Sequence, residues 1–153
     1  MDVGPSRRVF LQAAAVAGLA LTIRVEPARA TPERMQAAMR KVIGSAQVTP
    51  GRVTLEMPPL SENGHTVPLT VAVESPMTAA DHVRAIHLFT EKNPQPDVAT
   101  FHLSPRAGRA RVSTRVRLAD TQTVTAIGEL SDGSFWSGSA TVVVTLAACL
   151  EDA

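Results

Sequence analysis

Cys149 is the only cysteine in this 153-residue sequence, and it lies four residues before the sequence ends. A thiolate forms and breaks bonds to other sulfur atoms, but a lone cysteine has no partner for a disulfide within its own chain. Two roles fit such a residue: covalent chemistry with a molecule outside the chain, or burial as a small apolar side chain. The local sequence leaves both roles open.

The other polar side chains are weaker candidates for a site. The four histidines lack the spacing of a metal site, and without a second cysteine as ligand we expect no metal and no other cofactor. Four arginines alternate with apolar residues and should line one face of a strand: Arg109, Arg111, Arg115 and Arg117. This face is either solvated beside acidic side chains or able to dock an acidic partner or an oxyanion. No aromatic residues interleave with the arginines, so nucleic acid is not an expected partner.

Residues 1–30 have the pattern of an export signal. Twin arginines, Arg7 and Arg8, precede an apolar run over residues 13–23, which is shorter than the roughly 20 residues that a permanent membrane helix needs. The small residues of Ala28-Arg29-Ala30 predict cleavage after Ala30. We therefore expect export to the periplasm by the twin-arginine pathway, with a plain Sec signal or an N-terminal membrane anchor as the alternatives.

Removal of residues 1–30 from the 153 leaves 123 residues with eleven basic and twelve acidic side chains. This nearly neutral balance gives no reason to expect a nucleic acid or a membrane surface as partner. A chain of this length suits a single domain.

The elements that must position Cys149 are predicted from hydrophobic periodicity. Thr31 as N-cap, Pro32 in the first turn and Gly44 as a stop predict one short helix over Thr31–Ile43, with apolar residues at helical spacing. Seven later segments alternate as strands do: Arg52–Glu56, Thr66–Ser75, Val83–Thr90, Val98–Leu103, Gly108–Leu118, Thr121–Leu130 and Phe135–Thr145.

Seven short strands separated by Pro, Gly and Asn turns predict an all-β fold, an immunoglobulin-like antiparallel β-sandwich with one short N-terminal helix. The sandwich domain is expected over residues 31–146 and an extended C-terminal arm over residues 147–153. From the end of the last predicted strand, four extended residues would carry the Cys149 thiol about 14 Å beyond the sheet.

Four blocks in order resemble the Y subunit of the bacterial Sox sulfur-oxidation carrier, the SoxY family: Pro58–Met77, Phe89–Leu103, Ser113–Trp136 and the stretch VVVTLAAC that ends at Cys149. The resemblance implies an immunoglobulin-like carrier, not an enzyme, that pairs with a SoxZ-type subunit in a heterodimer. It also implies that Cys149, by matched position, holds a thiosulfate-derived sulfur as an S-thiosulfonate while other periplasmic Sox enzymes process it. The apolar residues on both faces of the strand Val83–Leu88 also favour a protein partner.

The arm departs from the Gly-Gly-Cys-Gly-Gly pattern of this family. Ala147 and Ala148 precede Cys149, and Leu150 and Glu151 follow it, with Asp152 next. The added side chains widen the arm, and the acidic charges disfavour the thiolate and repel thiosulfate. Three interpretations remain open: a working carrier, a carrier of another sulfur species, or a paralogue that keeps the fold and pairing without carriage.

Two other classes of function also remain, a cysteine-dependent enzyme and a purely structural sandwich domain. An enzyme would need a base held rigidly beside the thiol, which a tail position does not supply.

Overall fold

The computed structural model describes residues 31–146. In chain order its elements are α2 (Pro32–Ile43), β1 (Val48–Pro50), β2 (Val53–Glu56), β3 (Leu60–Ser61), β4 (Val67–Val73), β5 (Val83–Thr90), β6 (Asp97–His102), the 3-10 turn η1 (Pro105–Ala107), β7 (Arg111–Val116), β8 (Gln122–Leu130) and β9 (Phe135–Val144). The predicted helix and all seven predicted strands are present, with ends shifted by a few residues. The sequence pattern misses β1, β3 and η1 because segments this short carry no detectable periodicity.

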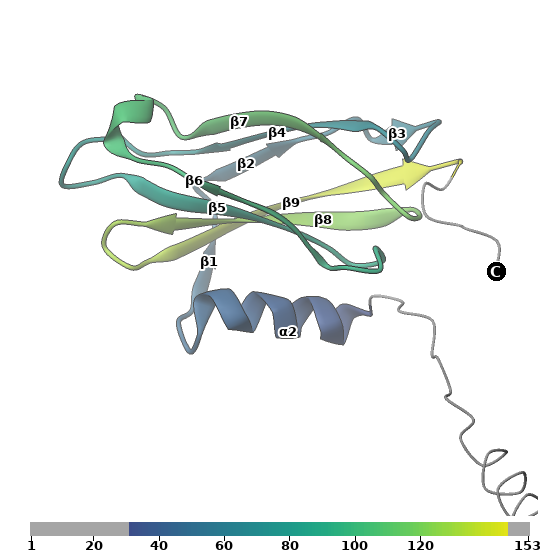
Figure 1. Cartoon of the computed structure of the whole chain (residues 1–153), viewed down its shortest axis with the longest axis horizontal. Helices are drawn as coiled ribbons and strands as arrows, with labels where there is room; N and C mark the ends of the chain where they lie inside the picture. The colour runs from purple at the N-terminus through teal and green to yellow at the C-terminus, as the bar shows by residue number, and fades with distance from the viewer. Residues whose placement is uncertain (1–30, 147–153) are drawn as a thin grey trace, which may run out of the picture.

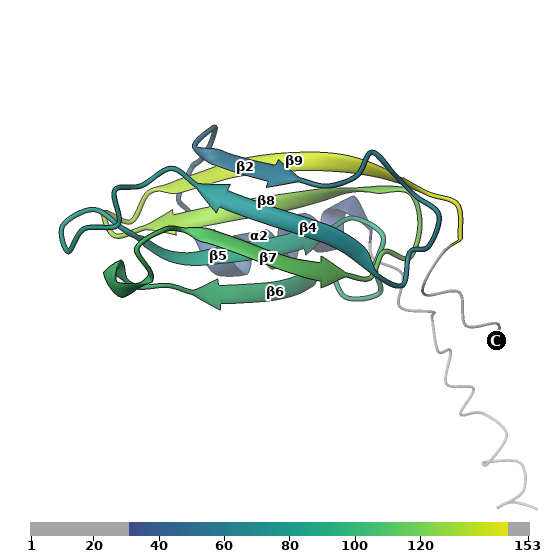
Figure 2. The ribbon, with the colours of Figure 1, turned by 90° about the horizontal axis from the view of Figure 1, so that it is seen from above.

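The strands form two facing sheets, and the predicted all-β sandwich with one short helix is confirmed. A six-stranded sheet has the order β1-β9-β8-β5-β6, with β3 also paired to β9, and a three-stranded sheet has the order β2-β4-β7. Figures 1 and 2 show the smaller sheet stacked on the larger one. The two short unpredicted strands, β1 and β3, run parallel to β9, whereas the other paired strands are antiparallel.

The core between the sheets follows from the alternation of the strands. In β4, Val67, Leu69 and Val71 are buried and the residues between them are less so. The backbones of β2 and β9 lie very close together at Gly138, where an added Cβ atom would collide with the carbonyl group of Val53. Glycine at this position allows the two backbones to touch.

Helix α2 covers the outer face of the six-stranded sheet (Figure 1). Its N-cap forms as predicted, since the Thr31 hydroxyl accepts a hydrogen bond from the backbone N–H of Arg34, and Gly44 ends it at a φ of 61°. One apolar cluster joins the helix to the sheet: Met35, Ala38, Met39, Val42, Ile43, Val48, Phe89, Ile127 and Phe135. Phe89 of β5, which directly follows the stretch Val83–Leu88, is thus buried against the helix within the chain.

Residues 1–30 and 147–153, which hold the expected export signal and the arm, lie outside the described residues. Among residues 31–146, no helix is both long enough and apolar enough to span a membrane.

Candidate functional site

The candidate site is the point at which the arm leaves the sandwich. Cys149 and its flanking residues Ala147, Ala148, Leu150 and Glu151 lie outside the described residues. The geometry of the site is therefore that of Leu146, the last described residue, and of the loops around it.

Backbone hydrogen bonds hold the chain up to Leu146. The N–H of Thr145 donates to the carbonyl of Ser61 at 3.1 Å, and the N–H of Gly64 donates to the carbonyl of Leu146 at 2.8 Å. The Thr121 hydroxyl accepts from the N–H of Val144 at 3.0 Å. Two residues beyond the end of β9 are thus still attached to the domain.

This attachment shortens the reach of the thiol. Cys149 follows Leu146 by three residues, which span about 10 Å when extended, compared with the 14 Å expected from the strand end alone. The sequence pattern marks Glu62-Asn63-Gly64 only as a turn and gives no sign that this loop binds the end of β9.

Exposed apolar side chains gather at the arm root. Within residues 31–146 the large apolar residues that remain exposed are Leu60 (53%), Val143 (44%) and Leu146 (69%). Leu60 and Val143 are direct register partners in the β3–β9 pair, and Leu146 follows three residues later. Exposed apolar groups at one location are typical of a contact surface; these three residues are called the root patch below.

A buried polar cluster ties the neighbouring loops together. The side-chain amide of Asn93 donates to the carbonyl of Arg117 at 2.8 Å, and its oxygen accepts from the N–H of Ala119 at 3.0 Å. Gln122 donates to the same Asn93 oxygen at 2.9 Å and accepts from the N–H of Lys92 at 2.8 Å. The sequence identified Asn93 only as part of a turn, and no local signal could reveal partners that lie more than 20 residues away.

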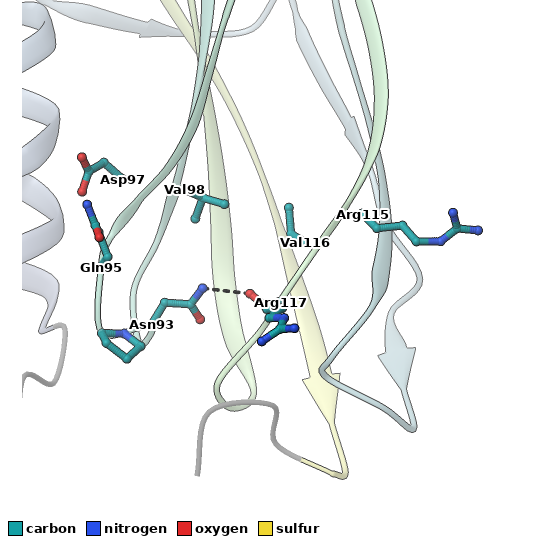
Figure 3. A pocket seen from close by; sticks show the side chains of 8 residues that line it. Asn93, Gln95, Asp97, Val98, Arg115, Val116 and Arg117 are labelled. Carbon is teal, nitrogen blue, oxygen red and sulfur yellow. Dashed lines mark hydrogen bonds between the residues drawn. The ribbon is translucent and has the colours of Figure 1, made fainter. Parts of the chain in front are cut away.

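A shallow groove of about 470 Å³ lies beside this cluster, between the β5–β6 loop and the end of β7 (Figure 3). It is lined by Asn93, Pro94, Gln95, Asp97, Val98, Arg115, Val116 and Arg117. Figure 3 shows the Arg117 side chain beside Asn93 and the Arg115 side chain pointing away from both. The groove lies at the arm end of the sandwich, since the N–H of Leu118 donates to the carbonyl of Gly64 at 2.8 Å and Gly64 in turn binds Leu146.

The arginine face has the predicted alternation. All four side chains are exposed: Arg109, Arg111, Arg115 and Arg117. Buried residues alternate with the last two, since Val116 lies between Arg115 and Arg117 and Leu118 follows Arg117. Arg111 forms an ion pair with Glu56 at 3.2 Å. Within the part of the chain that the structure describes, the other three arginines form no ion pair, so the expectation of a face laced with acidic residues holds for Arg111 alone.

The histidines do not converge on one site. Among residues 31–146, no group of three or more His, Cys, Asp or Glu residues is placed to hold a metal ion. His87 is buried with its Nδ1 3.0 Å from the Thr100 hydroxyl. Burial lowers the pKa of His87, and the Glu129 carboxylate partly opposes this shift from 3.7 Å, a distance too long for a hydrogen bond.

Comparison with known proteins identifies the family. A family model for the sulfur oxidation protein SoxY matches residues 39–149, which include Cys149. The solved structure of the sulfur carrier protein SoxY from Chlorobium limicola f thiosulfatophilum is 28% identical with a TM-score of 0.64, and the match covers 76% of this chain and 100% of that chain.

More distant structures share the sandwich alone. The superoxide reductase (neelaredoxin) of Ignicoccus hospitalis is 19% identical with a TM-score of 0.54, over 76% of this chain and 95% of that chain. The superoxide reductase of Nanoarchaeum equitans is 12% identical with a TM-score of 0.53, over 62% of this chain and 99% of that chain. A search of curated proteins found no match.

Proposed function

This chain belongs to the SoxY family of sulfur oxidation proteins, and we propose that it is a periplasmic sulfur carrier that holds thiosulfate-derived sulfur covalently on Cys149. The observation that carries the proposal is the family match, which continues through Cys149 on an arm that starts directly beyond the attached residue Leu146. A thiol on such an arm can enter the active site of another protein while the domain stays outside.

The chemistry of loading suits a thiol. The sulfur of Cys149 loses its proton and bonds to the outer sulfur of thiosulfate, which gives a Cys–S–S–SO3⁻ group. Two electrons leave in this step, and a haem-containing oxidase of the Sox system accepts them. Later steps cleave bonds at the carried sulfur, which thiol–disulfide chemistry makes accessible.

The chain acts in this scheme as a covalent scaffold for enzymes and not as an enzyme itself. We infer a SoxZ-type subunit as its stable partner and transient contacts with the Sox enzymes that process the cargo. The root patch of Leu60, Val143 and Leu146 supports such contacts because its apolar side chains are exposed close to the last residue before the arm.

The composition of the arm favours one alternative within the same family. Ala147, Ala148, Leu150 and Glu151 stand where SoxY arms are typically glycine, and they make this arm wider and more acidic. This arm fits a paralogue that keeps the fold and the pairing but carries another sulfur species or none.

Intact mass spectrometry tests carriage directly. The chain, mixed with its SoxZ-type neighbour, is incubated with thiosulfate and the cognate haem-containing oxidase, beside an established SoxY carrier treated in parallel. We expect the mass of one added thiosulfate group, reversible by dithiothreitol and missing in Cys149→Ser. An unmodified chain next to a modified established carrier would rule out thiosulfate carriage and favour the alternative.

Pairing and export are tested separately. Size-exclusion chromatography of the chain with and without the SoxZ-type neighbour should show a larger complex, and a stable monomer that ignores this neighbour contradicts the heterodimer. Replacement of both Arg7 and Arg8 by lysine should leave the precursor in the cytoplasm, because the twin-arginine pathway reads this pair. Unchanged recovery from the periplasm would contradict that route.

A further inference from the structure

We propose that the free edge of β7 binds an extended segment of a partner protein by strand addition, and that this segment carries acidic residues opposite Arg111 and Arg115. The bound segment becomes the fourth strand of the smaller sheet. This inference concerns a protein contact of the sandwich itself and does not depend on which sulfur species is carried.

One edge of β7 has no strand paired with it among the described residues. The smaller sheet has the order β2-β4-β7, and the neighbouring strand β6 is hydrogen-bonded to β5 of the larger sheet instead. The groove of about 470 Å³ lies between these two edges, since Val98 of β6 and Val116 of β7 both line it (Figure 3). An unpaired edge presents a row of free N–H and C=O groups to which another chain can bind.

The register of β7 on β4 decides which of its residues have free backbone groups. The N–H of Val73 in β4 donates to the carbonyl of Ala110 at 2.9 Å, and the antiparallel register continues from there along the whole of β7. In such a ladder the backbone groups of successive residues point alternately to the two sides. Because those of Ala110 point toward β4, those of Arg111, Ser113 and Arg115 point toward the free edge.

The same three residues carry their side chains on the outer face of the smaller sheet. Arg111, Ser113 and Arg115 are exposed, and the Ser113 hydroxyl lies 2.9 Å from that of Thr70 on β4. A residue that pairs directly with one of them therefore places its own side chain on this outer face, with its Cα about 5.5 Å away. An added strand thus brings every second side chain against an arginine or against Ser113.

Charge decides which kind of strand fits this edge. Residues 98–119 contain five arginines and no acidic residue. Within residues 31–146, Arg111 is paired with Glu56 and Arg115 forms no ion pair. Two copies of β7 paired antiparallel about Ser113 would place Arg111 opposite Arg115, and like charges directly opposite destabilise a sheet. Acidic residues in the added strand reverse the sign of this interaction, so the occupant is an acidic segment of another protein.

The remaining side chains of the added strand face the space between the two sheets. Phe101 of β6 and Val112 of β7 pack against the core and are only half-buried. Apolar side chains at the alternate positions would cover them. The expected segment therefore alternates acidic or polar residues with apolar ones.

NMR of the isotope-labelled chain, titrated with short blocked peptides, tests the proposal. The probe is Glu-Val-Thr-Val-Glu, whose acidic residues would lie opposite Arg111 and Arg115 and whose threonine would lie opposite Ser113. We expect the amide signals of these three residues to shift and their amide hydrogens to exchange several-fold more slowly. The signals of Val112 and Thr114, whose N–H groups point toward β4, should change less.

Matched peptides separate strand pairing from charge. Glu-Glu-Val-Val-Thr keeps the composition without the alternation, and Lys-Val-Thr-Val-Lys keeps the alternation with the opposite charge, so both should bind several-fold more weakly. Methylation of the threonine nitrogen of the probe removes a hydrogen bond to β7 and should abolish binding. Methylation of a valine nitrogen, which points away from β7, should be tolerated.

Matched variants of the chain test the arginines. Arg111→Gln with Arg115→Gln should weaken binding of the probe by up to about tenfold and remove most of its salt dependence. Arg40→Gln with Lys41→Gln removes two charges from helix α2, on the outer face of the larger sheet, and should leave the affinity unchanged.

Several results would overturn strand addition at β7. Equal binding of the rearranged or the threonine-methylated peptide would mean that charge alone attracts the probe. Signal changes centred on the root patch or on α2 would place the acidic segment elsewhere. Shifts of the β7 amides with the concentration of the chain alone would mean that a second copy occupies the edge. No thiosulfate or oxidase is present, so failure here is distinct from a failure of sulfur carriage.

Discussion

The two sheets of the sandwich differ in what covers their outer faces. The six-stranded sheet packs on the core with one face and on helix α2 with the other, where Ala38, Phe89 and Phe135 are buried. The three-stranded sheet buries only its inner face, and its outer face carries Arg111, Arg115 and polar residues. The larger sheet therefore supplies more of the buried apolar residues that stabilise the fold, whereas the outer face of the smaller sheet is open to charged partners.

The chain segment before the arm is linked to both sheets. Leu146 follows β9 of the larger sheet, and the loop that holds Leu146 also binds Leu118, just beyond β7 of the smaller sheet. Stability and arm position are thus expected to respond to different substitutions.

Substitution of Phe89 should give the largest difference in the free energy of unfolding between a residue of the larger sheet and one of the smaller sheet. Phe89→Ala removes a fully buried ring between β5 and α2 and should lower the free energy of unfolding by about 3–5 kcal/mol. Thr70→Ala on the outer face of the smaller sheet, where the Thr70 hydroxyl lies 2.9 Å from that of Ser113, should cost less than about 1 kcal/mol. Urea unfolding measures both, and equal losses would contradict the unequal roles of the sheets.

A second substitution tests the joint between the sheets. Gly138→Ala puts a methyl group against the Val53 carbonyl and forces β2 and β9 apart, which should cost roughly 1–3 kcal/mol. Ser139→Ala, at the next and exposed position of β9, is the control and should have little effect. A tolerated Gly138→Ala would show that the two sheets can separate at this point without loss.

The polar cluster at the arm end should contribute a similar or smaller amount. Asn93→Ala leaves the Arg117 carbonyl and the Ala119 N–H without their side-chain partner, at an expected cost of about 1–3 kcal/mol. Gln95→Ala in the same loop removes an exposed side chain and serves as control. Equal unfolding midpoints for the two variants would mean that water replaces the Asn93 contacts.

The pH dependence of stability should reflect His87. Its pKa is lowered mainly by burial, so the folded chain binds fewer protons than the unfolded chain below the ordinary His pKa of 6.5. The contribution of this neutral histidine is complete above pH 6.5 and is lost as the pH falls, with a slope of at most about 1.4 kcal/mol per pH unit.

His87→Gln should therefore give a shallower loss of stability in acid, as followed by urea midpoints from neutral pH downward. His65→Gln changes an exposed histidine and serves as the control. Parallel pH curves for the His87→Gln variant and the unaltered chain would contradict a buried neutral imidazole.

Substitutions on the open face of the smaller sheet should have the smallest effect on the free energy of unfolding. Arg115→Gln and Arg109→Gln should each change the free energy of unfolding by less than about 0.5 kcal/mol, since neither arginine forms an ion pair within the described residues. A larger loss for either variant would mean that this face contributes to the fold after all.

Local patterns were sufficient for most of the fold. Thr31, Pro32 and Gly44 mark the helix ends, and the alternation of β4 and β7 marks strands with one buried face, because capping and side-chain periodicity are properties of neighbouring residues. The same patterns failed at β1 and β3, which exist only because β9 offers them an edge to pair with.

Residue type and order along the chain are enough to predict the single thiol, its place after the last strand, the sandwich class and the family. The attachment of the last residue before the arm, and the loops around that residue, depend on tertiary contacts. Leu146 is held by Gly64, and Arg117 by Asn93, across separations in the chain that leave no local trace. Such contacts form when sheets twist and stack. That packing brings the groove lined by Arg117 and the root patch close to the last residue before the arm.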